Sequence, residues 1–237
     1  MKASLIIIGN EILSGRTQDK NLSYLATWLN EIGIQLSEVR VIRDEEDEII
    51  DTVNFLRKKY HYVFTTGGIG PTHDDITSES IAKAFNVDLE TNPQALAILK
   101  EYYKDSELTE ARLKMTKIPK GAELVENPVS KAPGFKIENV FVMAGIPKIM
   151  QGMLEGAKIH LSGGKPMKSE SIDVFMAESF IAKELSNMQD KFKDVEIGSY
   201  PFVKDGKYGT SLVMRSSNEV ILSECKAEIE HMISKLV

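Results

Sequence analysis

A turn with three glycines in four residues, 67–70, constrains the fold more than any other part of the sequence. It follows a short apolar run that is typical of a strand, and it precedes a segment whose apolar residues have helical spacing. Glycine lets the backbone turn tightly and leaves amide groups free to donate to an anion. Two carboxylates, Asp74 and Asp75, follow this turn, and such a pair suits a divalent cation shared with a phosphate. The alternative is a plain turn in which Asp74, Asp75 and Thr77 only cap the next helix.

Strand and helix patterns alternate along the first part of the chain. They predict strands at 5–8, 34–42 and 62–65 and helices at 21–32 and from 44 onward. This alternation is typical of an α/β fold with a parallel sheet and crossover helices. The strand ends would bring Gly9, Asp44 and Gly67 to one edge of the sheet, where ligands bind in open α/β sheets. We therefore expect one polar cleft at this edge.

The loop after the first strand supplies polar groups to the expected cleft. It runs from Gly9 to Gly15 and carries Asn10, Glu11 and Ser14. A plain turn with Glu11 in solvent is the alternative. Asp44, at the end of the second strand, is either a site carboxylate or the N-cap of the next helix.

The segment 66–77, Thr-Gly-Gly-Ile-Gly-Pro-Thr-His-Asp-Asp-Ile-Thr, resembles the signature of the molybdopterin-binding (MoCF, Mog-like) domain. Its form is that of the N-terminal region of the competence/damage-inducible protein A (CinA) family, and the same domain type precedes some eukaryotic FAD synthases. The loop at 9–15 fits the same pattern. The resemblance implies a three-layer α/β/α domain over 1–165 with a mostly parallel sheet. It implies substrate-binding roles for residues of the two loops: Gly9, Asn10, Glu11, Ser14, Gly67, Gly68, Gly70, Thr72 and Thr77.

Two later segments also fit the family pattern. Arg112 lies in a polar, helix-rich stretch at 92–117, and the resemblance suggests that it clamps a phosphate. A surface salt bridge is the alternative role for Arg112. The loop 127–135 is similar to the family's Asn-Pro-x-Gly-x-Ala-Pro-Gly-Phe, with Ser130 in place of one glycine and Gly134 as a further expected ligand contact.

A predicted hairpin, with strands at 135–137 and 140–143, leads to Gly145, another expected ligand contact. The family usually has proline where this chain has Ala144 and glutamate where it has Ile149. The loss of the glutamate bears on catalysis more than on fold, because the glycine turn and the helix start remain. If that glutamate positions a cation or a water, this chain is expected to bind ligand without efficient turnover.

The region after a Gly-Gly-Lys-Pro junction, 166–237, is expected to form a small α+β domain similar to the KH-like domain of the CinA family. The expected elements are helices at 177–188 and 223–236 and strands at 195–203 and 211–215. Its Gly-Lys-Tyr-Gly sequence at 206–209 matches the Gly-x-x-Gly of RNA-binding KH loops, but it joins two strands instead of two helices. From Lys168 onward there are nine Lys and Arg against twelve Asp and Glu, so we expect a dimerisation or lid element and no nucleic-acid binding.

Composition excludes several classes of function. The 237 residues are 42% hydrophobic, enough for a sizeable core, and the net charge of -6 argues against general binding to nucleic acid or an anionic membrane. Cys225 is the only cysteine, so no intrachain disulfide and no cysteine zinc cluster can form. The apolar run near Met1 leads into glycine and acidic sequence instead of a cleavage site, and we expect a cytoplasmic protein.

Two functional hypotheses remain from the sequence. The first is a metal-dependent hydrolase of a nucleotide diphosphate linkage such as that of ADP-ribose or FAD, as the resemblance implies. Asp75 would hold Mg, Mn or Co with help from Asp44 or Asp74, and the glycine amides would hold the diphosphate. The second is a module that binds molybdopterin or a nucleotide phosphate without turnover. Relatives form homo-oligomers, so a homo-oligomer is expected, and the family's deamidase domain has no counterpart before Val237.

Overall fold

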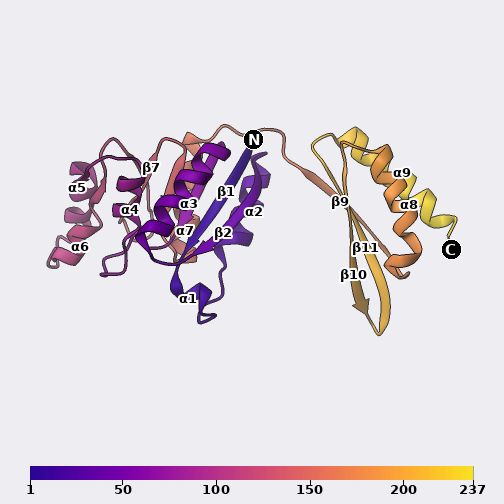
Figure 1. The fold of residues 1–237 in the computed structure, drawn as a ribbon, viewed down its shortest axis with the longest axis horizontal. Coiled ribbons are helices and arrows are strands. Elements are labelled where there is room, and N and C mark those ends of the chain that lie inside the picture. The colour runs from indigo at the N-terminus through magenta and orange to yellow at the C-terminus, as the bar shows by residue number, and fades with distance from the viewer. Residues whose placement is uncertain (237) are drawn as a thin grey trace. The chain divides into compact units, whose positions relative to one another are not determined.

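Figure 1 shows the fold of the protein, a computed structural model that describes residues 1–236. The chain forms two compact units, Met1–Gly164 and Lys165–Val237. Each unit has a hydrophobic core of its own, so each is described by itself.

The first unit is built on a six-stranded sheet with the order β2-β1-β3-β8-β7-β6. The strands are β1 (Lys2–Ile8), β2 (Gln35–Ile42), β3 (Tyr62–Thr66), β6 (Glu123–Val125), β7 (Gly134–Ile137) and β8 (Val140–Met143). The strands β2, β1, β3 and β8 pair in parallel, whereas β7 pairs antiparallel with both β8 and β6. The mostly parallel sheet and the hairpin of β7 and β8 predicted from the sequence are therefore confirmed.

Helices cover both faces of this sheet. On one face lie α2 (Asn21–Glu31) and α7 (Pro147–Ala157), and on the other lie α3 (Glu46–Lys59) and α4 (Thr77–Ala84). The unit also contains α1 (Asn10–Leu13), α5 (Pro93–Tyr102), α6 (Glu110–Lys114) and the 3-10 helix η1 (Lys158–His160). Side chains alternate along β1, so that Leu5 and Ile7 pack with α2 and α7 while Ile6 and Ile8 pack with α3 and α4. The result is a three-layer α/β/α domain.

Several short elements differ from the sequence-based expectation. The segment 9–15, expected as a loop, contains the one-turn helix α1. At the two ends of the stretch expected to be helical, 92–117, β4 (Leu89–Thr91) and β5 (Lys117–Pro119) form an antiparallel pair that was not expected, and β6 was not expected either. Each of these strands has three residues, too few for an alternating pattern to appear in the sequence.

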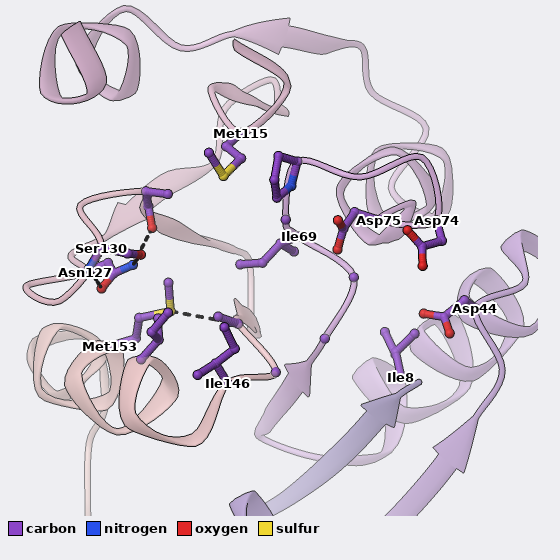
Figure 2. Close-up of a pocket in the computed structure, with 18 of the residues that line it drawn as sticks. Ile8, Asp44, Ile69, Asp74, Asp75, Met115, Asn127, Ser130, Ile146 and Met153 are labelled. Carbon is purple, nitrogen blue, oxygen red and sulfur yellow. Dashed lines mark hydrogen bonds between the residues drawn. The ribbon is translucent and has the colours of Figure 1, made fainter. Parts of the chain in front are cut away.

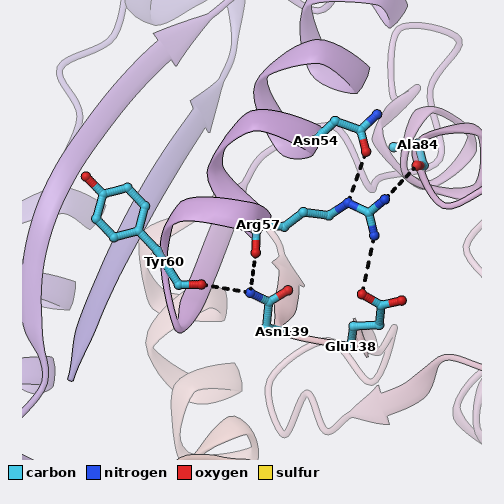
Figure 3. Close-up of polar contacts among 6 residues, drawn as sticks. All are labelled: Asn54, Arg57, Tyr60, Ala84, Glu138 and Asn139. Carbon is cyan, nitrogen blue, oxygen red and sulfur yellow. Dashed lines mark hydrogen bonds and ion pairs between the residues drawn. The ribbon is translucent and has the colours of Figure 1, made fainter.

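A cluster of polar contacts around Arg57 ties the chain together where β3 and β8 begin (Figure 3). The Arg57 guanidinium donates to the Asn54 side chain (3.0 Å), the Ala84 carbonyl (3.4 Å) and the Glu138 carboxylate (3.3 Å). The Asn139 amide donates to the carbonyl oxygens of Arg57 (3.0 Å) and Tyr60 (2.9 Å). This Arg57 cluster, residues Asn54, Arg57, Tyr60, Ala84, Glu138 and Asn139, joins α3, α4 and the β7–β8 turn.

The second unit is an antiparallel sheet with two helices. Its elements are β9 (Lys168–Val174), α8 (Glu178–Lys191), β10 (Glu196–Lys204), β11 (Lys207–Ser216) and α9 (Glu219–Ser234), and the strand order is β10-β11-β9. The order of the helices and of the last two strands agrees with the expectation, but β9 was missed because its Lys-Ser-Glu-Ser start does not resemble a strand. The 206–209 segment lies at and after the tight β10–β11 turn, so it does join two strands. Among the helices formed by residues 1–236, none has both the length and the apolar composition needed to cross a bilayer.

Candidate functional site

The glycine turn after β3 has a backbone that side chains would not permit. Gly67 has φ +109° and Gly68 has φ +67°. A Cβ atom at Gly67 would lie 2.1 Å from the carbonyl oxygen of Ile8, and one at Gly68 would lie 2.1 Å from Thr77 Oγ1. Thr77 fixes the turn further, because its hydroxyl donates to the Gly67 carbonyl (3.0 Å) and its N–H donates to the Gly68 carbonyl (3.0 Å).

Three consecutive amides of this turn are available to a ligand. The Gly67 N–H is not one of them, since it donates to the Met143 carbonyl (3.1 Å) and joins the turn to β8. The N–H groups of Gly68, Ile69 and Gly70 donate to no acceptor within residues 1–236. Successive free N–H groups in a tight turn form a concave anion site.

The three predicted carboxylates lie around the same turn (Figure 2). Asp44 Oδ2 accepts the N–H of Asn10 (2.8 Å), which fastens the end of β2 to the start of α1. Asp75 Oδ2 accepts both the N–H (2.8 Å) and the hydroxyl (2.5 Å) of Thr72. Asp74 is exposed, and the nearby Thr72 side chain, followed by its own backbone N–H, lowers its pKa.

These groups line a cleft of about 560 Å³, a size typical of small-molecule sites. Predicted site residues in its lining are Glu11, Asp44, Gly67, Gly68, Gly70, Asp74, Asp75 and Gly145. Gly145 packs on the turn, because a Cβ there would lie 3.3 Å from the Cα of Gly67. The sequence predicted that the ends of three strands would meet at one cleft. The structure agrees with this prediction.

Other predicted residues lie outside the lining of the cleft. They are Gly9, Asn10, Ser14, Thr72, Thr77, Arg112 and Gly134. The first five position the loops that bear the lining residues. Gly134 lies in β7, where a Cβ would come 2.4 Å from the Val142 carbonyl, so its lack of a side chain permits strand contact. Arg112 donates to the Glu107 carbonyl (2.5 Å) and covers the ring of Tyr103 at 3.9 Å.

The sequence did not predict the apolar wall of the cleft. It is formed by Ile8, Ile69, Pro71, Tyr103, Met115, Ala132, Ala144, Ile146, Ile149 and Met153, several of which Figure 2 shows facing the carboxylates across the cleft. Asn127 holds the neighbouring loop, because its amide donates to Ser130 Oγ (2.6 Å) and to the Ala132 carbonyl (2.7 Å). The sequence signals for this wall were the Asn-Pro start of that loop and the apolar residues Ala144 and Ile149 at positions of the family pattern.

The carboxylates of the cleft suit a divalent cation only if the bound ligand also coordinates that cation. Within residues 1–236, no group of three or more His, Cys, Asp or Glu side chains is placed to hold a metal ion. Mg²⁺, however, commonly takes one or two carboxylates and completes its shell with substrate phosphates and water. Asp44 and Asp75 each keep Oδ1 free of hydrogen bonds to the described residues. The site therefore suits a cation brought together with a phosphate.

Comparison with known proteins matches both units of the chain. Residues 4–161 match the model described as "Probable molybdopterin binding domain", and residues 166–237 match "FAD synthase, middle domain". A protein of Archaeoglobus fulgidus is 38% identical over 205 residues, which is 85% of this chain and 86% of that protein. A "CinA-like protein" of Kosmotoga olearia is 32% identical over 243 residues, which is 98% of this chain and 58% of the other.

A solved structure resembles the first unit. It is the crystal structure of "the protein CinA with unknown function from Thermoplasma acidophilum", which is 37% identical and superposes with a TM-score of 0.63. The match covers 68% of this chain and 98% of that one.

Proposed function

Because the chain belongs to the family of probable molybdopterin binding domains, we propose that its cleft binds a nucleotide through the phosphates and hydrolyses the diphosphate linkage with the help of a divalent cation. ADP-ribose and FAD are the substrates that we propose. The match of residues 166–237 to the middle domain of FAD synthase supports a nucleotide ligand.

One observation carries the proposal: free amides and free carboxylate oxygens line the same cleft. The N–H groups of Gly68, Ile69 and Gly70 attract a phosphate, whereas the carboxylates of Asp44 and Asp75 repel it. A cation between carboxylate and phosphate removes this repulsion. The two kinds of group are therefore complementary only toward a phosphate that arrives with a metal ion.

The residues have separable roles in this proposal. The amides at 68–70 bind and orient the diphosphate, while the Oδ1 atoms of Asp44 and Asp75 hold the cation. When bound, a divalent cation neutralises charge on the phosphates and lowers the pKa of a coordinated water. Asp74, whose pKa is lowered, stays ionised near neutral pH and adds to the negative potential that attracts the cation.

The test is AMP release from ADP-ribose in the presence of Mg, Mn or Co ions. Asp75→Asn keeps an oxygen that can accept from Thr72, so the turn is retained while one charge is lost. We expect AMP release to fall about tenfold or more in this variant. Asp51→Asn, an exposed change in α3, is the matched control and should leave the rate unchanged. Wild-type protein that releases no more AMP than an Asp75→Ala variant would overturn the hydrolase proposal.

A specific observation favours a second candidate, binding of a nucleotide or of molybdopterin without turnover. Ile149 lines the cleft at the position where the CinA-like pattern usually has glutamate, so this wall offers no carboxylate. Calorimetry that shows tight, cation-enhanced binding of ADP-ribose with no AMP release would select this candidate. Turnover that appears only in Ile149→Glu would support it further.

A further inference from the structure

The segment 71–74, between the glycine turn and α4, places the Asp75 carboxylate but has few contacts of its own. All four of its residues are exposed. Three hydrogen bonds join Thr72 to Asp75: the N–H (2.8 Å) and the hydroxyl (2.5 Å) of Thr72 donate to Asp75 Oδ2, and the Asp75 N–H donates to the Thr72 carbonyl (3.3 Å). The position of the Asp75 carboxylate therefore follows that of Thr72.

Lys114, in α6, holds this segment from another part of the chain. Its ammonium group donates to the Thr72 carbonyl, the same oxygen that accepts the Asp75 N–H. Within residues 1–236, no other residue outside 71–76 forms a hydrogen bond with the segment 71–74. Exposed segments with few contacts are the least stable parts of a fold, so the position of this one depends on a single tether.

The chain on both sides of Lys114 is anchored, which makes α6 a firm support. On one side, the Arg112 guanidinium lies over the ring of Tyr103 at 3.9 Å. On the other side, Thr116 is buried and its carbonyl accepts the N–H of Asn92 (2.9 Å). The Lys114 side chain therefore extends from a fixed element to an exposed segment.

Lys114 reaches Thr72 from outside the cleft. It lines a neighbouring hollow of about 610 Å³ and is not among the described residues that line the cleft itself. Asp75 lines both the hollow and the cleft. Lys114 is thus placed to act on the Asp75 carboxylate through Thr72, and not on a ligand in the cleft.

We propose that Lys114 is a positioning residue for the cation site: it holds the Thr72 carbonyl, and Thr72 in turn holds Asp75. The inference rests on the proposed function, because it requires that Asp75 helps to bind a cation together with a nucleotide. A hydrogen bond from an ammonium group is among the stronger kinds, so its loss should be measurable at the cation site.

Lys114→Met tests this role, because methionine keeps the apolar stem but cannot donate to Thr72. Lys117→Met is the matched control: Lys117 lines the same hollow, is exposed, and has no partner for its ammonium group within residues 1–236, so the same charge is lost without a contact. Lys114→Arg keeps a cationic donor and should restore the contact. The probe is ADP, titrated in the presence of Mg²⁺ by calorimetry, and thermal melts check that each variant folds.

We expect Lys114→Met to bind ADP with Mg²⁺ about fivefold more weakly than wild type, the effect of one lost hydrogen bond. Lys117→Met and Lys114→Arg should stay within about twofold of wild type. Lys114→Met added to Asp75→Asn should weaken binding by less than about twofold further, because the carboxylate that Lys114 positions is already gone.

Three outcomes would overturn the positioning role and leave nucleotide binding standing. They are equal affinities of Lys114→Met and Lys117→Met, no recovery in Lys114→Arg, and an undiminished loss when Lys114→Met is added to Asp75→Asn. The last would mean that Lys114 acts on the ligand directly. Failure of wild type to bind ADP or ADP-ribose at all, or binding by Asp75→Asn as tight as by wild type, would instead overturn the proposed function and this inference with it.

Discussion

The two ends of the parallel strands in the first unit are built differently. At the carboxyl ends, the glycine turn leaves the amides at 68–70 unpaired, and Asp44 and Asp75 keep Oδ1 free of hydrogen bonds to the described residues. At the amino ends of β3 and β8, the donors of Arg57 and Asn139 bind side chains and helix-end carbonyls (Figure 3). Groups left free can bind a ligand, whereas paired groups stabilise the fold. Substitutions at the two ends should therefore separate binding from stability.

Gly67→Ala should have the largest effect, because this substitution should reduce both ligand binding and stability. An alanine Cβ would meet the Ile8 carbonyl at 2.1 Å, so β1 and the turn must move apart. We expect a loss of about 3 kcal/mol in the free energy of unfolding, measured by urea denaturation, and loss of ADP binding.

Gly121→Ala is the control for Gly67→Ala. Gly121 also has positive φ, +81°, but nothing lies within 4 Å of a Cβ built there. Only the backbone preference is then lost, about 1 kcal/mol. Similar losses in the two variants would show that contact with Ile8 does not set the cost.

Arg57→Met should reduce stability without affecting the cleft. The change retains the apolar stem but removes three hydrogen bonds of a side chain that is 21% exposed. We expect a loss of about 2 kcal/mol and unchanged affinity for ADP with Mg²⁺. Arg43→Met removes ion pairs of a side chain that is 54% exposed, where solvent screens the charges, and should change stability much less than Arg57→Met does. A weakened ADP affinity in Arg57→Met would show that the two ends are coupled.

Asp44→Asn should show the opposite pattern at the other end. An asparagine oxygen can still accept from the Asn10 N–H, so the melting temperature should change little. The lost charge should weaken Mg²⁺-dependent binding of ADP about tenfold, or about 1.4 kcal/mol. Binding measured with EDTA in place of Mg²⁺ should not distinguish the variant from wild type, and a difference there would argue against a cation at Asp44.

The sequence predicted the cleft better than its surroundings for physical reasons. Backbone constraints are visible in residue type, so the glycines at 67, 68 and 70 and the strand end at Asp44 identified one edge of the sheet. The apolar wall comes from side chains with ordinary core composition, such as Ile146 and Met153, and their role depends on tertiary packing. The contact of Lys114 with the Thr72 carbonyl is likewise invisible in sequence, because only the folded chain brings these two residues together.

Glu38→Gln should give the smallest effect and the one that depends most on pH. Hydrogen bonds from Lys59 (2.7 Å), Tyr60 (2.8 Å) and Arg40 (2.8 Å) lower the pKa of Glu38 from 4.5 to about 2. The ionised carboxylate thus stabilises the fold above pH 4.5, and that contribution is lost as the pH falls toward 2. Allowing for solvent screening, we expect the variant to be about 1 kcal/mol less stable than wild type at pH 7, with a smaller gap near pH 3. Urea midpoints at the two pH values measure the gap. Because Tyr60 belongs to the Arg57 cluster and Lys59 precedes it in the chain, a constant gap would mean that packing, not charge, joins β2 to this end of the sheet.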